Sequence, residues 1–230
     1  MLPPPLADFK NYFTNNIRSL ELLSPDYLRQ RTRESAGSLG LGGQRLSAFL
    51  HEIGPPGRRK LTHELRKAYK QLNALEAKSL PYGWKKLEIQ EIYDLRKLVT
   101  EARHINDGML RLIAVLAELQ SEHQFILFDE IENGINPELV EFVLDSLISA
   151  QQQVLVTTHS PLILNYLTDE VAKDGVMYLY RTRGGSTKAV PFFSIPSLAK
   201  KLTVMGPGEA FVDTNLTLLR DEIERMTERQ

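Results

Sequence analysis

The chain has 230 residues, of which 42% are hydrophobic and 25% charged, a composition typical of a folded globular protein and not of a disordered chain or a coiled-coil rod. Its formal net charge of −1 provides no overall field that would attract nucleic acid or acidic lipid. The sequence lacks cysteine, which excludes disulfides, thiolate zinc sites and thiol nucleophiles and suits a reducing, cytoplasmic environment. It has no run of about 18 apolar residues, so we expect no membrane-spanning segment and no membrane partner.

Residues 1–100 are expected to form a mainly helical region that joins a second region near residue 100. Proline and glycine break residues 6–84 at several points, which indicates loops between short helices. Apolar or small residues recur at helical spacing between positions 61 and 80, which predicts an amphipathic helix with a solvated, charged face. The basic residues here are able to touch a phosphate backbone, but nothing in the sequence favours nucleic acid as a partner; they are Arg58, Arg59, Lys60, Arg66, Lys67 and Lys70.

Residues 101–230 are expected to form an α/β region with a largely parallel sheet and flanking helices. Short apolar runs alternate there with helical stretches, which is typical of strand-helix units. Late in the chain, two strand-like runs flank a glycine-containing turn and predict a β-hairpin. The expected elements are strands at 125–128 and 154–158, helices at 107–120 and 137–149, a hairpin of 176–180 with 187–193, and a last helix from about 214 to the end.

Two adjacent acids, Asp129 and Glu130, follow the predicted strand at 125–128. Ligands of open α/β sheets bind at the carboxyl ends of the strands. An aspartate there is able to hold a magnesium ion, and a glutamate one residue later is able to orient or deprotonate a water that attacks a phosphoryl group. Alone the pair is a weak signal, because an isolated acidic pair after a strand more often begins a loop or caps a helix.

Polar residues near the ends of neighbouring elements add candidates. His159 follows the next predicted strand, where a histidine is able to reach a γ-phosphate, although a single histidine is more often a loop or cap residue. Asn106, Asp107 and Gly108 open the predicted buried helix, and the free N–H groups of a helix start favour an anion. The same residue types fit an ordinary N-cap equally well.

Taken together and in this order, the segments resemble the ABC-type ATPases of the RecF, SMC and OLD-nuclease group, especially stand-alone bacterial AAA-family ATPases of that type. The resemblance covers roughly the last three fifths of the chain and rests on order and spacing together. Four motifs carry it: residues 106–111 look like the signature motif, 128–130 match Walker B with its catalytic glutamate, 133–136 stand where the D-loop belongs, and 158–161 match the switch-histidine loop.

The resemblance implies a P-loop-NTPase-like head that binds ATP and Mg²⁺ and hydrolyses ATP, with residues 1–100 as the middle part of the head. Asp129 would bind the metal, and Glu130 and His159 would be catalytic. Nucleotide lies between two heads in this family, so the resemblance also implies a head-to-head dimer. The residues expected to contact nucleotide are Asn106, Asp107, Gly108, Asn133 and Asn136.

The sequence departs from the family pattern at three points. Asn106 replaces the usual serine of the signature, and Asn136 replaces a more usual histidine or aspartate. No Gly-x-x-x-x-Gly-Lys-Ser/Thr loop, the Walker A motif, occurs in the sequence. We therefore expect the carboxyl-terminal part of an ATPase head, incomplete on its N-terminal side, that needs a Walker A-bearing partner or segment. The alternative is a degenerate half-ATPase that no longer hydrolyses nucleotide and acts as a protein-interaction module.

Overall fold

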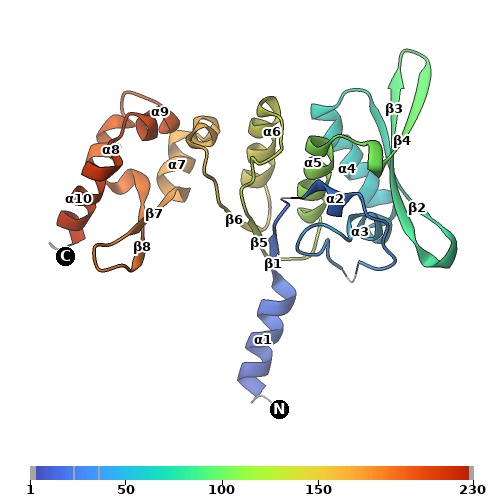
Figure 1. Ribbon diagram of the computed structural model, residues 1–230, viewed down its shortest axis with the longest axis horizontal. Coiled ribbons are helices and arrows are strands. Elements are labelled where there is room, and N and C mark those ends of the chain that lie inside the picture. Colours follow the sequence, from blue (N-terminus) through green and yellow to red (C-terminus); the bar gives the residue numbers. More distant parts are fainter. Residues whose placement is uncertain (1–3, 23, 36, 228–230) are drawn as a thin grey trace. The chain divides into compact units, whose positions relative to one another are not determined.

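The computed structural model describes residues 4–22, 24–35 and 37–227, and the chain divides into two compact units, Met1–Thr158 and His159–Gln230 (Figure 1). The sequence suggests a boundary between two regions near residue 100, and this boundary stays a prediction. The first unit contains a parallel sheet and an antiparallel sheet, and the second contains a hairpin with short helices.

Three parallel strands form the sheet that carries the acid pair. β5 (Phe125–Phe128) lies in the middle, with β1 (Ile17–Leu20) on one side and β6 (Gln153–Val156) on the other. The register places the last residues of the three strands side by side. The parallel sheet and the strand at 125–128 are confirmed, and the predicted strand at 154–158 is confirmed with its end two residues earlier. β1 lies in a segment whose sequence reads as helical.

Two helices flank β5 in the sequence. α5 (Asp107–Glu118) precedes β5, and all of its residues after the first are buried. α6 (Pro137–Ile148) connects β5 to β6 and buries an apolar face that includes Leu139, Val143 and Leu147. Both helices confirm the prediction within two residues at their ends. Asn136 occupies the N-cap position of α6, but its side chain makes no capping hydrogen bond.

The second sheet of the first unit is antiparallel and was not predicted. It consists of β2 (Leu72–Ser79), β3 (Lys85–Tyr93) and β4 (Arg96–Glu101), in that order. Two helices pack against it, α3 (Leu46–Glu52) and α4 (Gly54–Ala68) (Figure 1).

The predicted helix at 61–80 is wrong in its second half, because α4 ends at Ala68 and the chain continues as β2. The register shifts by one residue between Leu72 and Ala74, which is a β-bulge. The extra residue lets both Leu72 and Leu75 face the core, and both are buried. Their three-residue spacing therefore mimics a helical period although the backbone is extended.

The remaining described elements of the first unit are α1 (Pro4–Asn16), α2 (Pro25–Leu28) and two 3-10 turns, Pro81–Gly83 and Ala102–His104.

None of the described helices, in this unit or the other, is long and apolar enough to cross a membrane.

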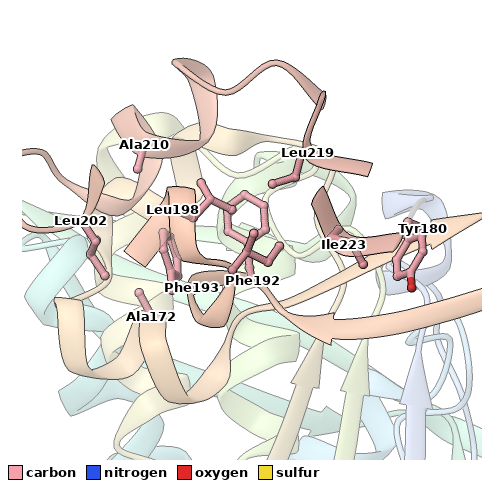
Figure 2. Close-up of a cluster of buried hydrophobic side chains, with 10 residues drawn as sticks. Ala172, Tyr180, Phe192, Phe193, Leu198, Leu202, Ala210, Leu219 and Ile223 are labelled. Carbon is pink, nitrogen blue, oxygen red and sulfur yellow. The ribbon is translucent and has the colours of Figure 1, made fainter. Parts of the chain in front are cut away.

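The second unit is organised around aromatic side chains. The Phe192 ring is buried, and its centroid lies 5.0 Å from that of Phe193, 5.4 Å from that of Phe211 and 5.5 Å from that of Tyr178. Figure 2 shows Phe192 and Phe193 together with aliphatic side chains from the surrounding helices. The buried cluster comprises Ala172, Tyr180, Phe192, Phe193, Ile195, Leu198, Leu202, Ala210, Leu219 and Ile223.

Two elements of the second unit were predicted, the hairpin and the last helix. The antiparallel pair of β7 (Met177–Arg181) and β8 (Thr187–Pro191) confirms the hairpin, with its second strand ending two residues earlier than predicted. The predicted last helix is α10 (Leu216–Thr227); residues 228–230 lie outside the described part. The other elements are 3-10 helices at Pro161–Tyr166 and Phe192–Ser194, α7 (Asp169–Gly175), α8 (Pro196–Lys201) and α9 (Pro207–Val212).

Candidate functional site

The acid pair lies at the carboxyl end of β5, beside the end of β6. Thr157, the residue after β6, contacts both acids: its hydroxyl donates to Asp129 Oδ1 (2.5 Å) and accepts the Glu130 backbone N–H (2.9 Å). Glu130 has a left-handed backbone with φ of +48°, which is uncommon for any residue but glycine. One hydroxyl therefore fixes the metal-binding candidate and the backbone of the catalytic candidate relative to each other.

The donor atoms around Asp129 suit a magnesium ion. The Asp129 carboxylate and the Thr157 hydroxyl offer oxygen ligands, and Mg²⁺ in phosphoryl-transfer sites usually takes one or two carboxylates together with substrate phosphates and water. Within the described ranges, no group of three or more His, Cys, Asp and Glu side chains is arranged to hold a metal. The residues present fit an ion that is shared with a phosphate.

The turn after the acids is tied back to the strand ends. The Asn133 side-chain amide donates to Glu130 Oε2 (3.3 Å), and the Asn133 backbone N–H donates to the Glu130 carbonyl (2.9 Å). The Thr158 hydroxyl donates to Glu132 Oε1 (2.7 Å). The turn is thus held at Glu130 on one side and beyond β6 on the other, which limits how far the Glu130 carboxylate can move.

Arg111 joins this turn to α5. The residue is 6% exposed, and its Nη1 donates to the Asn133 carbonyl (2.6 Å). Burial lowers the pKa of the Arg111 guanidinium, and the negative charge of Asp107 opposes this shift. Gly134 allows the close approach: its φ is +67°, and a Cβ there would lie 2.6 Å from Arg111 Nε.

Asn106 and Asp107 hold the start of α5. Asn106 Oδ1 accepts the Met109 N–H (2.8 Å), so this residue is an N-cap, the ordinary alternative for this position. The Asp107 carboxylate pairs with Arg29 Nη2 at 2.5 Å. The same Arg29 nitrogen donates to the Ile105 carbonyl (2.9 Å), which ties the segment after β1 to the start of α5.

Gly108 is the point where the signature-like segment meets the D-loop-like turn. The residue is buried, and a Cβ there would lie 3.4 Å from the Gly134 carbonyl oxygen and 3.5 Å from Asn136 Oδ1. Methyl-sized groups would therefore fit, but a longer side chain would push against the backbone of the turn.

Seven of the eight predicted site residues lie in the first unit, where their contacts link the end of β5, the following turn and the start of α5. His159, the eighth, is exposed and begins the second unit, so its proximity to the acids stays a prediction. The seven residues are Asn106, Asp107, Gly108, Asp129, Glu130, Asn133 and Asn136.

The sequence interpretation gave no role to two residues of this arrangement, Thr157 and Arg111, although Arg111 ends the signature-like segment 106–111. Thr157 follows from strand register: Phe128 pairs with Val156, so the next residues, Asp129 and Thr157, come side by side. Arg111 stands in a helix that is otherwise almost wholly apolar, and a charged residue in a buried helix indicates a specific polar partner.

A protein-family model matches residues 26–165, which is more than half of the chain; its description is "AAA domain, putative AbiEii toxin, Type IV TA system". The matched range includes every predicted site residue. No curated protein matches the chain.

Solved structures of SMC ATPase heads resemble the chain in three dimensions. One, described as "Structural biochemistry of ATP-driven dimerization and DNA stimulated activation of SMC ATPases", is 16% identical with a TM-score of 0.48, over 70% of this chain and 99% of that one. Another, "Crystal structure of the SmcHead bound to the C-winged helix domain of ScpA", is 19% identical with a TM-score of 0.43, over 66% of this chain and 46% of that one.

Proposed function

We propose that this chain, which belongs to the AAA-domain family whose model it matches, supplies the catalytic acids of a Mg²⁺-dependent, ABC-type ATP hydrolase head. The observation that carries the proposal is the position of Asp129 and Glu130 at the carboxyl end of a parallel sheet, with the Thr157 hydroxyl between them. Nucleotide phosphates approach this end of such sheets.

Each acid has a distinct role in this proposal. Asp129 binds the magnesium ion that neutralises the phosphate oxygens, and Glu130 orients or deprotonates the attacking water. The left-handed backbone of Glu130 and its bond from Asn133 hold the carboxylate near the end of β5. His159 acts on the γ-phosphate from the segment that follows β6.

The signature-like residues act across a dimer. Asn106 and Asp107 are exposed at the start of α5, where they are accessible to a nucleotide held by a second head. Gly108 allows the close packing between this segment and the turn that contains Asn133 and Asn136. A nucleotide bound by one head therefore contacts the start of α5 in the other head. That helix start packs against the turn that follows the acids of its own head.

The phosphate loop comes from a partner chain or from another segment of a longer chain. β6 is paired on one side only in the described sheet, and Leu155 within it is 48% exposed. A strand with one unpaired edge and an exposed apolar residue is able to accept a further parallel strand. A Gly-x-x-x-x-Gly-Lys loop after such a strand would stand at the same end of the sheet as Asp129.

The absence of that loop from the sequence favours a second candidate, a half-ATPase that pairs with a complete head without hydrolysing nucleotide. ATP turnover by the native assembly, purified through an affinity tag on this chain, separates the two. The hydrolase proposal expects Mg²⁺-dependent turnover that Glu130→Gln lowers at least about 100-fold.

Glu141→Gln is the matched control, because Glu141 is exposed on α6 and its substitution removes the same negative charge. Turnover that survives Glu130→Gln unchanged refutes the catalytic role of this residue. An assembly that binds ATP but shows no turnover in either form supports the half-ATPase.

A further inference from the structure

The outward face of α4 is basic along its length. At 3.6 residues per turn, the helical members of this face fall within an arc of about 120°. Glu64 is the one acid of α4, and it pairs with Lys67 at 2.5 Å. The side chains of this face are all exposed; they are Arg59, Lys60, His63, Arg66 and Lys67 on the helix and Lys70 just beyond it.

Three of the basic side chains on the helix have no structural task that the fold reveals. Among the described residues, Arg59, Lys60 and Arg66 make no ion pair or side-chain hydrogen bond. Their neighbour Arg58 differs, since it points back and donates to the Leu50 carbonyl (2.9 Å). Three cations are thus available to an external anion.

The opposite face of α4 anchors the helix to the antiparallel sheet. Leu61 and Leu65 are fully buried, and the Thr62 hydroxyl accepts the Leu75 N–H of β2 (3.2 Å). The helix is therefore anchored to the sheet, and its backbone keeps the spacing between the basic residues constant. Because the apolar side is already covered by protein, α4 has no free apolar face to insert into a membrane, which surface-lying helices require.

We propose that the basic face of α4 binds the phosphate backbone of nucleic acid without regard to base sequence. Arg59 and Lys67 are eight residues apart, which is about 12 Å along the helix axis. One strand of duplex DNA places roughly three to four phosphates along that distance. Arginine and lysine side chains dominate this face, and their contacts to phosphate position a protein on nucleic acid without carrying sequence information.

The test is binding of a fluorescently labelled 20-base-pair DNA duplex and of the corresponding single strand, followed by anisotropy over a series of salt concentrations. The full chain is compared with the triple variant Arg59→Gln, Lys60→Gln, Arg66→Gln. We expect the variant to bind about tenfold or more weakly at 0.1 M salt, and the slope of log K against log salt to shrink by about 2 to 3, since each lost phosphate contact accounts for about 0.9.

The matched control removes three exposed positive charges from the second unit, with Lys173→Gln, Lys188→Gln and Lys200→Gln. It has the same net charge as the α4 variant and is expected to keep a salt slope near that of the unmodified chain. Circular dichroism of both variants checks that the fold is retained. If both variants lost DNA affinity equally, the proposal would be overturned, because binding would then respond to net charge alone.

Three further outcomes would also overturn it: no binding of either nucleic acid at low salt, an unchanged slope in the α4 variant, or equally strong binding of polyglutamate. Vesicles containing anionic lipid serve as a last arm. Binding to vesicles that the α4 variant abolishes, without binding to DNA, would assign this face to a membrane and contradict the proposal.

Discussion

Replacing Gly134 by alanine tests the contact between the turn after the acids and α5. Two costs arise from the structure. The backbone of Gly134 has φ of +67°, where a Cβ costs roughly 1–2 kcal/mol. The added Cβ would also lie 2.6 Å from Arg111 Nε and 2.7 Å from Cζ, so the guanidinium must move away from the Asn133 carbonyl. Losing a hydrogen bond from a charged donor costs about 1.5–3 kcal/mol.

We therefore expect Gly134→Ala to lower the free energy of unfolding by about 2.5–5 kcal/mol. Gly37→Ala is the matched control, because Gly37 has φ of +69° and a Cβ there would meet nothing within 4 Å. In the control, the free energy of unfolding should fall only by the cost of a Cβ at positive φ, about 1–2 kcal/mol.

Urea unfolding followed by tryptophan fluorescence makes the comparison, since Trp84 is the single tryptophan and lies in the first unit with both glycines. Equal losses in the two variants, within about 0.5 kcal/mol, would refute the reasoning, because they would mean that Arg111 adjusts without cost. A larger loss in Gly134→Ala would support the role of Arg111 in holding the turn.

Three more predictions concern the site and the antiparallel sheet. Thr157→Val should lower ATP turnover of the native assembly by about 10-fold to 100-fold, and Thr157→Ser should restore it; full activity of the valine variant would show that the hydroxyl does not position the acids. Gly108→Glu should abolish ATP-dependent dimerisation measured by light scattering, and unaltered dimerisation would count against a signature that acts in trans. Hydrogen bonds from Lys78 and Lys86 lower the pKa of the Glu88 carboxyl, so its stabilising effect is present above the unfolded-state pKa and is lost as the pH falls through the lower, folded-state pKa. Urea midpoints of the unmodified chain should therefore fall below about pH 4.5 more steeply than those of Glu88→Gln, and parallel curves would contradict this assignment.

The α/β part of the fold was predictable because its patterns are local. Residues 125–128 form an apolar run that ends in acids, and Pro137 and Gly134 mark a turn and a helix start. The hairpin of β7 and β8 follows from two strand-like runs around Gly185. Such signals need no information from distant parts of the chain.

The antiparallel sheet was missed because its strands depend on one another. The spacing of Leu72 and Leu75 fits a helix, and only pairing with β3 and the bulge before Ala74 make it a strand. β1 has four residues, too few for a period to be recognised, and its pairing with β5 spans more than a hundred positions of sequence.

The site shows the same division. The order of motifs identified Asp129 and Glu130, but the contact of Arg111 with the Asn133 carbonyl arises only when α5 packs beside the turn. Asn106 takes the N-cap role, which its residue type allowed, through a local hydrogen bond from the Met109 N–H, and its contact with nucleotide stays a prediction. Tertiary packing, which the sequence pattern does not encode locally, decides the contact of Arg111 but not this cap.

The measurement that tests the central claim most directly is the nucleotide content of the native assembly carrying Glu130→Gln. After incubation with ATP and Mg²⁺ and removal of free nucleotide by gel filtration, the bound nucleotide is released and separated into ATP and ADP. If Glu130 activates the attacking water, the variant binds ATP but cannot cleave it, so ATP is retained, whereas the Glu141→Gln control yields ADP. Bound ADP in the Glu130→Gln assembly would contradict the claim that this chain supplies the catalytic carboxylate.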